Sequence, residues 1–126
     1  MIFATVKAYT AQAVEATAPT AVQTNFASII GRPRNGNISR LVEFRLASPS
    51  VSGSPTAVLF DIYRFNPGTV TVDYLTTYTV NATDITAGKV APIIAETWGN
   101  ELMVKVSFTG GTAPTFTGTV QARVLE

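Results

Sequence analysis

Apolar and polar side chains alternate along several stretches of this 126-residue chain. Between residues 41 and 46 every second side chain is apolar, and charged residues occupy positions between them. Residues 101–109 and 115–125 show the same pattern, and residues 2–9 show it with less apolar character. A period of two predicts β-strands that have one face on a core and one on solvent. Antiparallel sheets accommodate such strands, because their second face can stay hydrated.

The middle of the chain is more continuously apolar. Residues 57–65 contain few polar residues, which predicts a strand covered on both faces. The Asn-Pro-Gly sequence at residues 66–68 predicts a turn, since proline presets one backbone dihedral and glycine accepts a positive one. Residues 69–80 are rich in β-branched and aromatic side chains, as strands are. The length of this segment predicts a bend or bulge near Thr76 and Thr77.

Little of the sequence favours helix. Only residues 91–98 could form a short one, and Pro92 would suit its first turn. Seven or eight short strands with almost no helix predict an all-β fold in one domain, residues 1–126. The expected architecture is an antiparallel β-sandwich of jelly-roll or another Greek-key type. Further turns are predicted at residues 34–37, 52–55, 87–88 and 109–112.

Residues 10–24 depart from the alternating pattern. They are rich in alanine and threonine and contain no aromatic side chain. One interpretation is a long surface loop or irregular edge strand, and the other is an extended arm that packs on a neighbouring subunit. The second interpretation makes Thr10, Val14 and Val22 candidate interface residues.

The composition offers little for catalysis. The chain has no histidine and no cysteine, and only 13% of its residues are charged. Enzymes that work near neutral pH usually recruit histidine, an activated thiol or converging carboxylates. Asp61 and Asp73 could face each other on adjacent strands, but an ordinary cross-strand polar contact is the stronger expectation. We therefore expect no enzyme activity, no cofactor and no dedicated metal site.

The charge balance also limits the classes of partner. A net charge of +1 does not indicate a duplex-binding surface. The local basic cluster of Arg32, Arg34 and Arg40 is either a solvated loop or a contact with carboxylates of a partner. Aromatic stacking residues do not accompany it, so nucleic-acid binding is not expected. No apolar run is long enough to predict a membrane span.

Aromatic residues are the remaining candidates for binding. They could form a platform for a sugar ring or an anchor in a protein interface, although core packing is the default for the phenylalanines. Trp98 precedes a Gly-Asn pair at the start of a strand, where it could lie at a rim and contact a partner. The candidates are Tyr63, Phe65, Tyr74, Tyr78 and Trp98.

The carboxy-terminal half of the chain carries a family resemblance. The sequence Thr86-Ala87-Gly88, residues 98–106 and residues 117–120 resemble small β-sandwich head decoration or cement proteins of tailed bacteriophages. The resemblance implies a dimer or trimer on a capsid that clamps major capsid protein or other virion subunits. It also implies that residues 10–24 reach onto a neighbour. The amino terminus lacks a secretory signal pattern, so we expect synthesis in a host cytoplasm without processing.

A physical argument points in the same direction. A weakly charged exterior suits repeated subunit contacts, which are depleted of charge at their centres. Closed symmetric oligomers are the usual way to bury such a surface. The alternative is a carbohydrate- or receptor-binding β-sandwich of a fibre or secreted protein. That alternative predicts exposed coplanar aromatic rings beside carboxylates or amides, whereas a decoration protein would bury its aromatic residues at subunit contacts.

Overall fold

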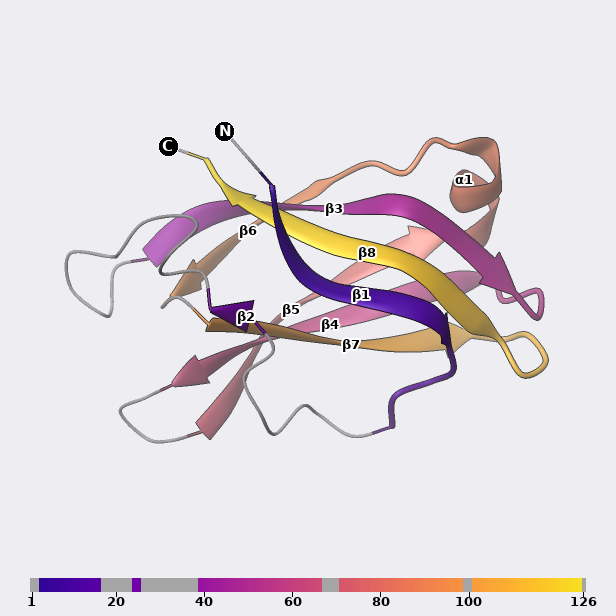
Figure 1. The fold of residues 1–126 in the computed structure, drawn as a ribbon, viewed down its shortest axis with the longest axis horizontal. Coiled ribbons are helices and arrows are strands. Elements are labelled where there is room, and N and C mark those ends of the chain that lie inside the picture. The colour runs from indigo at the N-terminus through magenta and orange to yellow at the C-terminus, as the bar shows by residue number, and fades with distance from the viewer. Residues whose placement is uncertain (1–2, 17–23, 26–38, 67–70, 99–100, 126) are drawn as a thin grey trace.

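The chain folds into two antiparallel sheets, which confirms the all-β class and the predicted sandwich (Figure 1). The computed structural model describes residues 3–16, 24–25, 39–66, 71–98 and 101–125. Within them, a single short helix, α1 (Ala82–Ala87), accompanies the strands. The strands are β1 (Ala4–Gln12), β2 (Thr24–Asn25), β3 (Ser39–Ser52), β4 (Ala57–Asn66), β5 (Thr71–Asn81), β6 (Ile93–Trp98), β7 (Glu101–Thr109) and β8 (Thr115–Val124).

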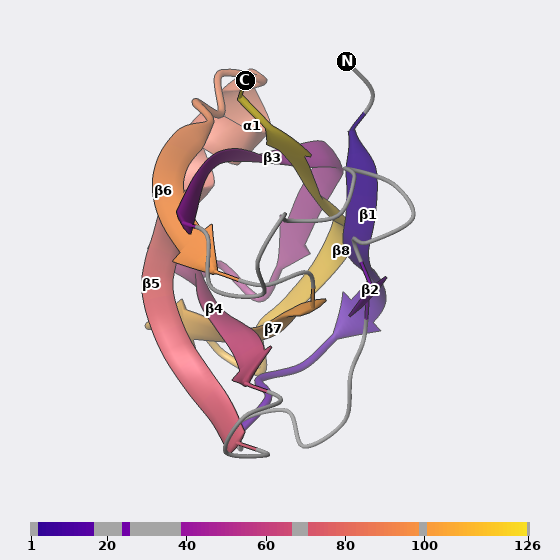
Figure 2. The ribbon, with the colours of Figure 1, turned by 90° about the vertical axis from the view of Figure 1, so that its left-hand side faces the viewer.

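The strands pair in a nested order. β1 pairs with β8, β2 with β7, β3 with β6 and β4 with β5. Further pairing of β3 with β8 and of β4 with β7 completes one sheet, here called sheet A, in the order β1-β8-β3-β6, and a second, sheet B, in the order β2-β7-β4-β5. Figure 2 shows β5 beside β6 on one side of the sandwich and β1 beside β2 on the other.

The core lies between the two sheets and is built from alternate residues. In β8 every second side chain is buried, in agreement with the predicted alternation. Phe60 of β4 lies at the centre, with its ring centroid 5.0 Å from that of Phe116 on the opposite sheet. Tyr9 and Tyr78 complete this aromatic group, and all four residues are almost fully buried. Burial of these large side chains from both sheets holds the layers together.

The predicted turns at one end of the sandwich pack on each other. Gly53, between β3 and β4, adopts a φ of +82°, and its carbonyl accepts a hydrogen bond from the Thr112 N–H between β7 and β8. A Cβ added at Gly53 would lie 2.6 Å from the Pro114 Cα. Glycine is therefore required at Gly53 both by the left-handed backbone and by the close approach of the second turn.

The helix lies elsewhere than the sequence predicts. Residues 93–98 form β6 and pair with β3, whereas the helix follows β5 and ends at Gly88, whose φ is +69°. The prediction for residues 91–98 is wrong because β6 pairs with β3, and the alternate residues Ile93 and Ala95 of β6 pack against the core. That tertiary pairing outweighs the weak local signal of Pro92. The Gly88 turn was correctly located, but it serves as the helix C-cap.

Strand β4 is not enclosed on both sides. Its inward residues, such as Val58 and Ile62, are fully buried, whereas the outward Leu59 and Asp61 are half-buried. The second face of the strand is therefore only partly covered, although the apolar run of residues 57–65 predicted full cover.

Candidate functional site

A β-bulge in β5 places an exposed tyrosine on the outer face of sheet B. Ile62 of β4 pairs with Thr76, but the next residue, Tyr63, pairs with Tyr74, so one residue of β5 is extra. Tyr74 and Thr77 are three positions apart and would lie on opposite faces of a regular strand. The bulge brings them onto the same face, which confirms the irregularity predicted near residues 76–77. Bulges commonly redirect a side chain in this way, often beside functional sites.

A row of polar groups crosses three strands beside Tyr74. Asp61 of β4 pairs with Thr77 of β5 on one side and with Lys105 of β7 on the other. Thr77 Oγ1 donates to Asp61 Oδ1 over 2.7 Å, and Lys105 Nζ lies 3.8 Å from Asp61 Oδ2. The Tyr74 hydroxyl lies 2.6 Å from Thr77 Oγ1. We call this group, Tyr74, Thr77, Asp61 and Lys105, the tyrosine surface.

The predicted aromatic platform is only partly present. Tyr74 is 58% exposed, whereas Tyr63 is almost buried and the two rings meet at 72° with centroids 5.9 Å apart. Tyr78 lies in the core, where its hydroxyl donates to the Ala91 carbonyl and burial raises its pKa to about 12. The structure therefore offers one exposed ring here, and the side chains of Phe65 and Trp98 lie outside the described part.

The two candidate carboxylates face opposite sides of sheet B. Asp73 pairs with Arg64, whose Nε lies 3.5 Å from Asp73 Oδ2. Arg64 and Asp61 are three residues apart on β4, so their side chains project to opposite faces. Each aspartate makes the ordinary cross-strand polar contact that the sequence predicted, but with a cation rather than with the other aspartate.

A polar cluster that the sequence did not predict links the two sheets at Glu15. The Glu15 carboxylate accepts hydrogen bonds from Lys7 Nζ (3.0 Å), the Tyr9 hydroxyl (2.8 Å) and the Val106 N–H (3.0 Å). The Glu15 N–H donates in turn to the Val106 carbonyl. Burial alone would raise the pKa of Glu15, but these hydrogen bonds outweigh it and hold that pKa below its usual value.

The same cluster changes the acidity of Tyr9. Burial, reinforced by the hydrogen bond and the negative charge of Glu15, raises the pKa of Tyr9 well above its usual value. Tyr9 therefore stays protonated and remains a donor to Glu15. No local motif could have revealed the cluster, because 91 positions separate Glu15 from Val106 in the chain.

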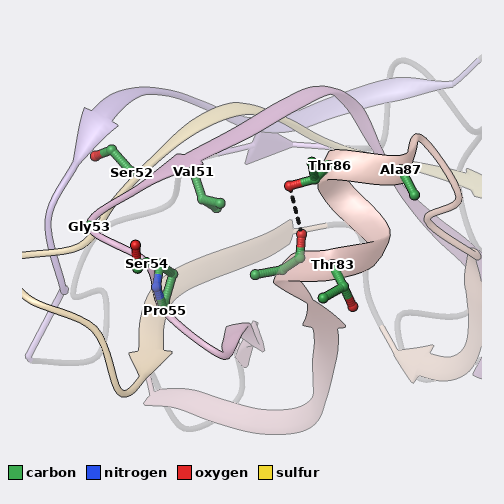
Figure 3. Close-up of a pocket in the computed structure, with 9 residues that line it drawn as sticks. Val51, Ser52, Gly53, Ser54, Pro55, Thr83, Thr86 and Ala87 are labelled. Atoms are coloured by element: carbon green, nitrogen blue, oxygen red, sulfur yellow. Dashed lines mark hydrogen bonds between the residues drawn. The ribbon is translucent and has the colours of Figure 1, made fainter.

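A pocket of about 490 Å³ opens between α1 and the β3–β4 turn (Figure 3). Its walls are residues 51–55 on one side and Ala82, Thr83, Thr86 and Ala87 on the other. The Thr86 hydroxyl donates a hydrogen bond to the Ala82 carbonyl of its own helix, which Figure 3 marks with a dashed line. The described lining contains no charged or aromatic side chain, and its polar side chains are those of Ser52, Ser54, Thr83 and Thr86.

The predicted interface residues are scattered over the fold. Thr10 is exposed near the end of β1, and Val14, 57% exposed, lies in the segment that Glu15 fastens to β7. Arg40 lies in β3 and Trp98 ends β6, where it pairs with Ser39, but their side chains are outside the described part. Val22, Arg32 and Arg34 also lie outside the described residues.

Two further exposed apolar side chains lie on the outer face of sheet A. Leu41 of β3 is 51% exposed and Ile94 of β6 is 60% exposed. Leu41 pairs with Glu96, and Ile94 pairs with Glu43, so the two apolar residues are diagonal neighbours. In the described part of the chain β6 pairs only with β3, so this apolar pair lies at an edge of sheet A. We call Leu41, Ile94 and the β6 edge the β6 surface.

Among the described residues there is no group of three or more acidic side chains that could hold a metal ion. Likewise, none of the helical segments that the structure describes is long and apolar enough to cross a membrane. Comparison with known proteins returns nothing, since no family model, curated protein or solved structure matches this chain.

Proposed function

We propose that this chain is a virion structural protein that decorates a capsid shell and stabilises it by clamping neighbouring subunits. The β6 surface is the observation that carries the proposal. Leu41 and Ile94 are large exposed apolar side chains at a strand that pairs, among the described residues, only with β3, and exposed apolar surface of this kind favours association. A second subunit that covered Leu41 and Ile94 would remove this apolar area from water.

The strand order supports a jelly roll as the type of sandwich. Pairing of the first strand with the last, the second with the seventh and so on is the order produced by rolling up one long hairpin. Jelly rolls occur in viral capsid and lectin domains, among others. A fold does not imply a function, so this order is consistent with the proposal without carrying it.

The low surface charge supports repeated contacts. Only 13% of the residues are charged, about half of the 25% usual for a soluble domain. Charged residues are depleted at the centres of interfaces. Many weak contacts of one kind, repeated around a shell, give a strength that no single contact supplies.

Sedimentation tests the proposal directly. We would separate a native lysate of the source on a density gradient and detect the chain by mass spectrometry. Decoration predicts co-migration with very large particles at a fixed stoichiometry. If the chain instead stayed at the top of the gradient as a free monomer or small oligomer, the proposal would be overturned.

Variants of the β6 surface test where the contact lies. We expect the double variant Leu41→Thr and Ile94→Thr to release the chain from the particles, because both changes keep strand propensity but remove apolar contact area. Thr79→Ala is the control, since Thr79 is exposed on β5 in the other sheet. Full retention of the double variant would contradict a contact at the β6 surface.

A further inference from the structure

The tyrosine surface presents its exposed ring in a fixed orientation. The bulge sets the backbone of Tyr74, the ring of Tyr63 lies 5.9 Å away at a steep angle, and the Tyr74 hydroxyl is hydrogen-bonded to Thr77 Oγ1. An exposed side chain usually loses rotamer freedom when a ligand binds, and that loss reduces affinity. Tyr74 is already held in place, so a ligand that stacks on it would bear little of this cost.

The hydrogen-bond directions in the polar row follow from its chemistry. An ionised carboxylate only accepts hydrogen bonds, so Thr77 must donate its single hydroxyl proton to Asp61. The contact between Tyr74 and Thr77 is then made by the Tyr74 O–H as donor. This arrangement leaves the lone pairs of Tyr74 Oη as acceptors.

Hydrogen-bond donors lie at the other end of this polar row, at Lys105. Lys105 Nζ carries three N–H donors and forms an ion pair with Asp61 Oδ2, which lies 3.8 Å away. One surface thus combines an apolar ring face, hydroxyl acceptors and an ammonium donor within three adjacent strands. Vicinal hydroxyl groups on a pyranose ring both donate and accept hydrogen bonds, and the C–H face of such a ring is apolar.

We infer that the tyrosine surface is a saccharide-binding site, in which a pyranose ring stacks on Tyr74 and its hydroxyls bond to Asp61 and Lys105. The ligand class is a neutral saccharide, because Asp61 and Lys105 cancel each other's charge and a free carboxylate on the ligand would meet Asp61. This inference does not depend on the proposed role in a capsid, since the β6 surface lies on the other sheet.

Affinity electrophoresis tests this site with defined probes. The purified chain would be run in native gels that contain hydroxyethylcellulose, galactomannan, dextran or soluble starch as neutral probes, and polygalacturonate as an acidic probe. We expect at least one neutral polysaccharide to retard the wild-type chain. Absence of retardation by all four neutral probes, or retardation by polygalacturonate alone, would overturn the inference.

Variants locate the binding on the surface. Tyr74→Ala should weaken binding about tenfold or more, as expected for the loss of an anchoring aromatic residue. Tyr74→Phe keeps the ring and should retain most of the binding, and Thr79→Ala, on the same face of β5, is the matched control. Equal retardation of wild type and Tyr74→Ala would contradict the site.

An NMR titration of the wild-type chain with a saccharide tests the site without variants, so its result does not depend on how a variant folds. Amide resonances would be followed by NMR while an oligosaccharide of the retarding polysaccharide is added. We expect the largest shifts at Asp61, Tyr74, Thr77 and Lys105. Shifts centred elsewhere, for example on the pocket beside α1, would reject the tyrosine surface as the binding site.

Discussion

The carboxylate of Glu15 joins the first strand of sheet A to strand β7 of sheet B. β2 pairs with β7 only at Leu102 and Glu101, which leaves the edge at Val106 without a strand in the described residues. Glu15 bonds there to both the N–H and the carbonyl of Val106. A single residue thus satisfies backbone groups that an unpaired edge would expose.

We predict that Glu15→Gln lowers the free energy of unfolding by about 1.5–3 kcal/mol at neutral pH, the usual contribution of a hydrogen bond to a charged group. The neutral amide also loses its attraction to Lys7, which lies 3.0 Å from the carboxylate. Urea denaturation measures the change. Glu96→Gln, at an exposed carboxylate of β6, is the control and should cost less than about 1 kcal/mol.

The Glu15 cluster also predicts a pH dependence of stability. The pKa of Glu15 is lower in the folded state than its ordinary value of 4.5. The contribution of Glu15 is therefore fully present above that ordinary pKa and disappears as the pH falls through the folded pKa. The stability difference between wild type and Glu15→Gln should narrow as urea denaturation is repeated from pH 7 down to pH 3. A difference independent of pH would contradict this account.

At the level of elements, irregular backbone determines how the strands meet. The bulge in β5 turns Tyr74 outward, and the two glycine turns at the end of the sandwich pack backbone against backbone. Gly53 and Gly88 both have positive φ, but only Gly53 has backbone atoms where a Cβ would lie. Substitution of Gly88 therefore tests conformational strain alone, whereas substitution of Gly53 tests strain together with steric overlap.

We predict that Gly88→Ala costs about 1–2 kcal/mol, the penalty of a left-handed conformation for a residue with a Cβ. Gly53→Ala should cost about 1–3 kcal/mol more, because the two turns must move apart. Thermal and urea unfolding of the two variants measure the difference. Equal losses of stability would show that the contact between the turns adds nothing.

For the molecule as a whole, one aromatic group unites the sheets. Phe60 contacts Tyr9 and Phe116 of sheet A and Tyr78 of its own sheet. Its neighbour Leu59 points to the outer face and is half-buried. Substitutions at Phe60 and Leu59, which are adjacent on β4, therefore allow the interior of the sandwich to be compared with its outer face.

We predict that Phe60→Ala lowers the free energy of unfolding by about 3–5 kcal/mol. A loss of that size is a large fraction of the 5–15 kcal/mol, roughly, by which domains are stable. Leu59→Ala should cost clearly less, since little cavity forms at a half-exposed position. Urea midpoints would be compared, and a similar loss for both variants would mean that Phe60 is not central to the core.

Much of the fold could be predicted from the sequence. The alternation in residues 101–109 and 115–125 determines which side chains face the core, because the period of a strand is two wherever it pairs. Gly53 and Gly110 lie in predicted turns, where the chain passes from one sheet to the other. The absence of histidine and cysteine limits the chemistry available in any tertiary structure.

The sites depended on the tertiary structure. Glu15 meets Val106 across 91 positions, and Tyr74 shares a face with Thr77 only because β4 and β5 pair with a bulge. Residues 93–98 form a strand because β3 pairs with them, although Pro92 gave a weak local signal for the start of a helix. Local pattern determines which way a side chain alternates, whereas the partner it meets depends on strand pairing between distant segments.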